Sequence, residues 1–154
     1  MSIDERLKEL GIVLPEVPKP LGSYVPFVRT GRLVFISGML PLKDGKLISQ
    51  GKLGAEVSLE EGVLLARAAA INALAVLKEA TGSLDNVTRC VKLTGFIASA
   101  PGFTDQPKVI NGASDLMKEV FGAAKGLHAR AAVGANELPM DTPVEIEFIF
   151  EVEK

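Results

Sequence analysis

The sequence is poor in the residue types that most metal sites and many nucleophilic enzymes use. Among its 154 residues it has one histidine, His128, one cysteine, Cys90, and no tryptophan. A metal centre with several histidine or cysteine ligands is therefore not expected. A Ser-His-Asp triad would have to use His128, and no Gly-x-Ser-x-Gly element exists to pair with it. No Gly-x-Gly-x-x-Gly motif follows a strand-like run, so we also expect no cofactor.

Long runs of like-charged residues or of apolar residues are absent as well. The 17 basic and 19 acidic residues give a net charge of -2, which does not indicate a nucleic-acid-binding surface. No apolar run is long enough to span a bilayer, and the opening Met-Ser-Ile-Asp-Glu-Arg lacks the apolar core of a signal peptide. Together with the single cysteine, these features predict a cytoplasmic protein without a membrane partner.

The chain has the composition of a globular protein, with 47% hydrophobic residues and the length of one domain. Ser2 followed by Glu5 predicts a short helix, and the prolines that follow predict a stiff connector. We therefore expect residues 1–18 to form an N-terminal arm and residues 19–154 to form a single domain.

Capping residues and hydrophobic periodicity locate the elements of that domain. Ser58-Leu-Glu-Glu61 is the clearest helix start and Gly82 its end. The other expected elements are a hairpin over 27–41, a strand over 87–97, a helix over 109–121 that ends at Gly122, and two closing strands. This order predicts an α+β fold, a mixed sheet with two long helices on one face. The second face has no cover within the chain, so oligomerisation is expected.

The two closing strands hold the candidate chemistry. Alternation from residue 144 onwards places Val144, Ile146 and Phe148 on one face, with Glu145 and Glu147 on the other. Arg130 lies in the preceding strand-like run. From spacing alone, Arg130 either pairs with Glu145 or Glu147 across neighbouring strands or holds a carboxylate ligand near a water-activating carboxylate. The cross-strand pair is the more ordinary interpretation. Further polar candidates are Tyr24, Ser37, Asn111 and Asp115.

Four short segments resemble a known family, the YjgF/Rid proteins, which are reactive-intermediate (enamine/imine) deaminases. The specific part is Arg130 with Leu138-Pro139 eight residues later and then Glu145. The other matching segments are Gly22-Ser-Tyr24, Ile36-Ser37-Gly38-Met-Leu-Pro41 and Val144-Glu145-Ile-Glu147. The resemblance covers roughly residues 19–152.

The resemblance implies a chorismate-mutase-like α+β fold and a homotrimer with clefts between subunits. It also implies cofactor-free, metal-free hydrolysis of small 2-imino or 2-enamino acids to 2-keto acids and ammonia. Arg130 would hold the substrate carboxylate and Glu145 would position the water, which makes these two the expected catalytic residues. Tyr24 would close the cleft, and Ser37, Asn111, Ala131 and Ala132 would line it.

Some positions depart from the family pattern. Residues 1–18 form a longer arm than in the typical member, and Ala132 stands where many members have a cysteine. The family's cleft asparagine corresponds either to Asn111 or to Asp115.

Two alternative functions stay open at this point: a non-catalytic trimer that binds small carboxylates, and an endoribonuclease or translation inhibitor, a label that the family has carried. A ribonuclease would need acid-base groups beside phosphate-binding cations, which one histidine and an acidic balance do not favour.

Overall fold

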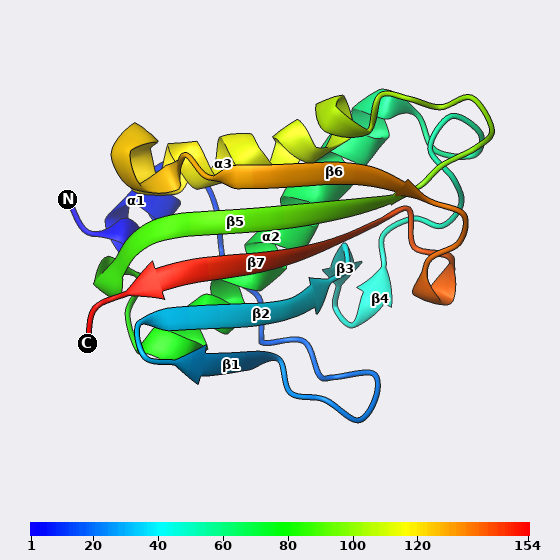
Figure 1. Cartoon of the computed structure of the whole chain (residues 1–154). Coiled ribbons are helices and arrows are strands. Elements are labelled where there is room, and N and C mark those ends of the chain that lie inside the picture. Colours follow the sequence, from blue (N-terminus) through cyan, green and yellow to red (C-terminus); the bar gives the residue numbers. More distant parts are fainter.

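One mixed five-stranded sheet with two long helices behind it makes up most of the molecule (Figure 1). The computed structural model describes all residues, 1–154. The sheet order is β1-β2-β7-β5-β6, and a two-stranded ribbon, β3-β4, stands apart. This is the predicted α+β arrangement. The bounds are α1 Ile3–Glu9, β1 Phe27–Thr30, β2 Leu33–Met39, β3 Leu42–Lys43, β4 Lys46–Leu47, α2 Leu59–Thr81, η1 Leu84–Asn86, β5 Val87–Ala98, α3 Gln106–Gly126, β6 Ala129–Ala135, η2 Pro139–Asp141 and β7 Val144–Val152.

The helix ends follow the capping signals closely. The Ser58 side chain accepts from the Glu61 amide at the start of α2, and Gly82 closes that helix in the left-handed region, with φ 76°. Helix α3 is longer than expected at both ends. Gly122 does interrupt it, with φ 77° and ψ 168°, but the chain resumes helical geometry and continues to Gly126.

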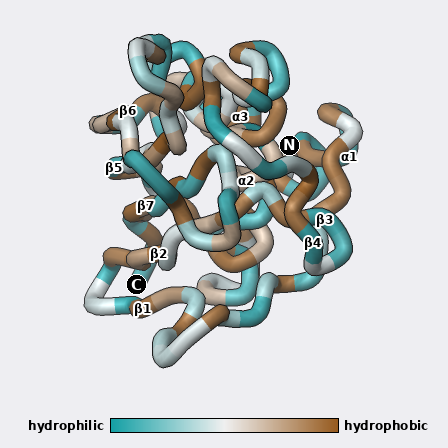
Figure 2. Tube along the Cα trace, turned by 90° about the vertical axis from the view of Figure 1, so that its right-hand side faces the viewer, coloured by the Kyte–Doolittle hydropathy of each residue, from teal (hydrophilic) through white to brown (hydrophobic).

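The core lies between the sheet and the two long helices. Side chains at alternate positions of β7, Val144 to Val152, are buried there as predicted. The arm packs on the same core: Leu7 of α1 is buried, and Leu10, Ile12 and Val17 contact the cluster. Figure 2 shows the strands of the main sheet along one side of the molecule, with α2, α3, α1 and the β3-β4 ribbon on the other. The division into an arm and a domain stays a prediction, although the arm is docked.

The expectation that the two closing strands are neighbours is wrong. β6 pairs in parallel with β5, and β5 pairs antiparallel with β7, so β5 separates the two strands. The physical reason is the β5-α3-β6 connection. Parallel strands need a crossover, and α3 provides it, placing β6 at the sheet edge beside β5. The chain then returns across the sheet through η2 to begin β7.

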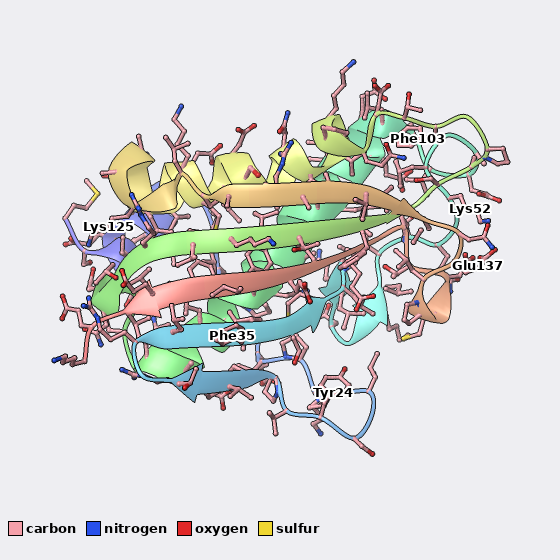
Figure 3. All side chains as sticks on the ribbon, in the orientation of Figure 1. Tyr24, Phe35, Lys52, Phe103, Lys125 and Glu137 are labelled. Carbon is pink, nitrogen blue, oxygen red and sulfur yellow. The ribbon has the colours of Figure 1, made fainter.

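The sheet face away from the helices carries apolar side chains exposed in the single chain. Val28, Phe35 and Val133 are 55%, 41% and 43% exposed there, and Phe35 projects from the face turned to the viewer in Figure 3. The same face has a shallow pocket of about 370 Å³ that includes Lys92 and Glu147. Cover of this face by other copies of the chain stays a prediction. None of the helices combines the length and apolar character needed to cross a bilayer.

Candidate functional site

A pocket of about 460 Å³ opens beside the N-terminal end of β7. Its walls include three predicted site residues, Tyr24, Ser37 and Glu145, together with Gly38 and Pro139. Residues 18–21 of the connector form another wall, and Tyr24 projects from the loop that follows (Figure 3). We call it the Tyr24–Glu145 pocket. Glu145 is the only acidic side chain in its walls, so a carboxylate faces a mostly apolar chamber.

A local irregularity of the sheet makes room for the Glu145 carboxylate. The register between β2 and β7 shifts between Ile36 and Met39, and Gly38 lies in that irregular stretch. A Cβ atom on Gly38 would collide with the Glu145 carboxylate, so the glycine is needed for this close approach. Burial, with a smaller contribution from the charge of Glu147, raises the pKa of Glu145 above its ordinary value.

Tyr24 and Ser37 both hold the loop that borders the pocket. The Tyr24 hydroxyl accepts from the Leu21 amide at 3.0 Å. The Ser37 hydroxyl donates to the Val25 carbonyl at 2.7 Å. Because the single hydroxyl proton of Ser37 is already donated to the backbone, Ser37 is better suited to fix the loop than to donate to a ligand.

Arg130 lies on the opposite, helix-covered face of the sheet. Its Nη1 donates to Asn111 Oδ1 at 2.7 Å and to Ser114 Oγ at 3.3 Å, both on α3. Arg130 takes part in none of the five ion pairs of the structure. The cross-strand pair with Glu145 or Glu147 is therefore absent from the chain, because the intervening β5 separates the strands. Of the two α3 candidates, Asn111 contacts the guanidinium, whereas Asp115 makes neither a hydrogen bond nor an ion pair with it.

The structure does not bring all the predicted residues together. The register pairs Arg130 with Leu93 of β5, which on its other side pairs with Phe148 of β7, whereas Glu145 of β7 pairs with Phe96. Two strand spacings and three residues along the sheet therefore put the Arg130 and Glu145 Cα atoms about 14 Å apart.

The two alanines also divide between the faces. Ala131 pairs with Thr94 and lies on the open face, whereas Ala132 pairs with Gly95 and packs against the core. Neither alanine is part of the Tyr24–Glu145 pocket.

Two residues near Arg130 were missed by the sequence prediction. Ser114 Oγ lies 2.9 Å from His128 Nε2, and His128 Nδ1 lies 2.7 Å from the Gly126 carbonyl oxygen. We call Arg130, Asn111, Ser114 and His128 the Arg130 cluster. The spacing contained a usable signal, since Asn111 and Ser114 are three residues apart on a helix, while His128 and Arg130 are two apart at the start of a strand.

No group of three or more histidine, cysteine, aspartate or glutamate side chains is arranged to hold a metal ion. The polar groups in place are instead a guanidinium with donors to spare, a half-buried carboxyl group, and a chamber between apolar walls. Such a set can bind a carboxylate and move a proton.

Comparison with known proteins agrees with this fold. The model of the YjgF/chorismate mutase-like family, whose description also includes the label endoribonuclease, matches residues 4–151. The chain belongs to the YjgF family. The match begins inside α1, so it includes most of the N-terminal arm as well as the domain.

Individual relatives of this YjgF-family chain differ in what their names say. Protein TCP17 of Trypanosoma cruzi is 43% identical over 146 residues, covering 95% of this chain and 91% of that protein. The 2-iminobutanoate/2-iminopropanoate deaminase of Dermatophagoides farinae is 31% identical over 142 residues, covering 92% and 95%. Among solved structures, Atu1372 from Agrobacterium tumefaciens, described as of unknown function, has a TM-score of 0.91 at 44% identity. That alignment covers 98% of this chain and 92% of that one, so it includes most of residues 1–18.

Proposed function

We propose that the protein hydrolyses small 2-imino or 2-enamino acids to 2-keto acids and ammonia, at sites shared between copies of the chain in a homotrimer. The observation that carries the proposal is the half-buried Glu145 carboxyl group in the wall of the Tyr24–Glu145 pocket. A carboxyl group with a raised pKa accepts and returns protons more readily near neutral pH than an ordinary glutamate does.

The free donors of Arg130 support a carboxylate substrate. A guanidinium has five N–H donors, and the two on Nη1 are directed to Asn111 and Ser114. The remaining three, on Nε and Nη2, include the edge that binds a carboxylate with two parallel hydrogen bonds. The deaminase name of the Dermatophagoides farinae relative supports the same substrate class.

The separation of Arg130 from Glu145 supports a site made by two copies. A three- or four-carbon acid cannot reach both side chains of one chain, because they lie on opposite faces of the sheet and their Cα atoms are about 14 Å apart. A second copy that places its β6 edge over the Tyr24–Glu145 pocket would bring the two groups together. The exposed apolar side chains of the open sheet face, Val28, Phe35 and Val133, supply a surface that such an assembly would bury.

In the proposed reaction, the Arg130 guanidinium holds the substrate carboxylate and a water molecule stands between Glu145 and the imine carbon. Glu145 takes one proton as the water oxygen attacks that carbon. That proton passes to the imine nitrogen, which gives a tetrahedral carbinolamine. Glu145 then takes the proton of the new hydroxyl group and transfers it to the amino group, as the keto C=O bond forms, the C–N bond breaks and ammonia leaves. One imine and one water give one keto acid and one ammonia, and no other reactant is consumed.

Turnover is the direct test. Freshly generated 2-iminopropanoate or 2-iminobutanoate should release keto acid faster with the wild-type protein than in buffer alone. Glu145→Gln should lower kcat on the order of 10²–10⁴-fold, whereas Glu147→Gln, two residues along the same strand face, should retain most of it. A wild-type protein that binds keto acids but does not accelerate release would refute the deaminase and leave the carboxylate-binding module.

Mixing variants tests the shared site separately. Arg130→Ala and Glu145→Gln chains are each expected to be inactive alone. If one copy supplies the arginine and the next copy the glutamate, random co-assembly restores an intact pair at roughly a quarter of the interfaces of a closed ring. Recovery of about a quarter of wild-type activity supports the shared site. A monomer in light scattering, or no recovery in verified mixed oligomers, contradicts it.

A further inference from the structure

The Arg130 cluster contains more than the proposed reaction uses. The Ser114 side chain makes hydrogen bonds only with Arg130 and His128, and the His128 side chain only with Ser114 and the Gly126 carbonyl group. His128 is also the only histidine of the chain. Both are partly buried between α3 and the start of β6. Their hydrogen bonds connect the guanidinium, through two side chains, to the backbone at the end of α3.

The direction of each hydrogen bond in this connection follows from the groups present. The Gly126 carbonyl oxygen can only accept, so His128 Nδ1 has the hydrogen and donates it over 2.7 Å. In the neutral ring, Nε2 then has the lone pair and accepts from the Ser114 hydroxyl over 2.9 Å. The Ser114 oxygen, its own proton directed to His128, accepts from Arg130 Nη1 over 3.3 Å. The donors thus run in one sense, from Arg130 to Ser114 to His128 to the backbone.

We infer that Ser114 and His128 are positioning residues for Arg130. Asn111 and Ser114 accept from the two donors of Nη1 and so leave the Nε and Nη2 edge of the guanidinium for a substrate carboxylate. His128 fixes the Ser114 hydroxyl so that its oxygen lone pairs stay directed to Arg130. The inference rests on the proposed role of Arg130 as the carboxylate-binding residue.

An arginine on an exposed strand edge has many accessible rotamers, and each must be given up when a ligand is bound in one geometry. Hydrogen bonds that fix the guanidinium beforehand reduce that cost. Loss of the Ser114 hydroxyl is therefore expected to weaken carboxylate binding and raise KM, with a smaller change in kcat, because Glu145 and its pocket lie on the other face of the sheet.

Two substitutions of His128 separate this role from simple stabilisation. In His128→Asn, the amide nitrogen takes the place of Nδ1 and keeps the donor to Gly126, while the acceptor for Ser114 is lost. In His128→Gln, the longer side chain places an oxygen near the Nε2 position and keeps the acceptor, while the bond to Gly126 is lost. If the positioning role holds, affinity for the keto acid falls in His128→Asn, which loses the contact with Ser114, and stays close to wild type in His128→Gln, which keeps it. If the two residues only join α3 to β6, affinity falls in proportion to the loss of thermal stability in each variant.

The experiment measures the Kd for pyruvate or 2-oxobutanoate, KM, kcat and Tm on the full-length protein and its variants. Ser114→Ala and His128→Asn should each raise Kd and KM about tenfold, the equivalent of one hydrogen bond to a charged group. Ser114→Thr, which retains the hydroxyl, and His128→Gln should stay within about threefold of wild type, whatever their Tm. Wild-type affinity in Ser114→Ala, or losses that follow Tm across the four variants, would overturn the inference.

Arg130→Ala is measured in the same series to distinguish the two proposals. If Arg130→Ala loses affinity for the keto acid while Ser114→Ala does not, only the positioning role fails. If Arg130→Ala binds the keto acid normally, the carboxylate-binding role of Arg130 fails, and the positioning inference is overturned with it.

Discussion

Replacing Arg130 is the most informative single change, because the structure separates its effect on binding from its effect on stability. Arg130→Ala removes the free Nε and Nη2 edge and the two Nη1 bonds to α3. Each charge-assisted hydrogen bond to a ligand contributes about 1.5–3 kcal/mol, and the exposure of the site favours the lower value. Loss of two such bonds, about 3–4 kcal/mol, corresponds to a rise in Kd of about 10²–10³-fold.

The expected cost in stability is small. The two bonds from Nη1 are exposed, so their loss should lower the free energy of unfolding by about 1–2 kcal/mol. For a chain of this length that is a fall in Tm of about 2–8 °C. Arg130→Lys keeps the positive charge but cannot bind a carboxylate in bidentate fashion, so its Kd should lie between those of wild type and Arg130→Ala.

Calorimetric or NMR titration with pyruvate measures Kd, and a thermal melt of the same sample measures Tm. Arg29→Ala is the matched control, because Arg29 is exposed on β1 and donates to the Glu153 and Gly31 carbonyls away from both sites. Arg130→Ala with a Kd within about twofold of wild type, and a Tm loss as its main effect, would refute the reasoning.

Three further outcomes are expected. Gly38→Ala should displace the Glu145 carboxylate and lower kcat about 10–100-fold, with a change in unfolding free energy below about 1 kcal/mol because the displaced group is the end of a flexible side chain. Glu145→Gln should raise Tm at pH 7 and leave it unchanged at pH 4. The pKa of Glu145 is raised in the native state, so the native state binds the extra proton, and stability falls as the pH rises from the ordinary carboxyl value through the raised one. Gly112→Ala should lower Tm by about 6–12 °C in a thermal melt, because its Cβ would collide with the Val63 carbonyl oxygen where α2 and α3 meet, an overpacking cost of about 3 kcal/mol.

The sequence by itself determined the parts of the fold that depend on neighbours along the chain. The period-2 pattern of residues 144–152 assigned Phe148 to the core and Glu145 to the other face, because successive strand residues must alternate. The Ser58 cap and Gly82 end bounded α2 for equally local reasons. The spacing of Arg130, Leu138-Pro139 and Glu145 was specific enough to indicate the family. Gly122 was also identified as a break, but its effect on α3 was overestimated.

Only the tertiary structure decided which of these residues meet. A strand pattern tells which face a residue occupies, but not which strand lies alongside, since that depends on the crossover through α3 and on the pairing of β7 with β2. Because β5 lies between β6 and β7, Arg130 is separated from Glu145, and its hydrogen-bond partners are Asn111 and Ser114 of α3. The irregularity at Gly38 that admits the Glu145 carboxylate and the turn of His128 toward Ser114 are likewise consequences of contacts between elements, for which no local pattern codes.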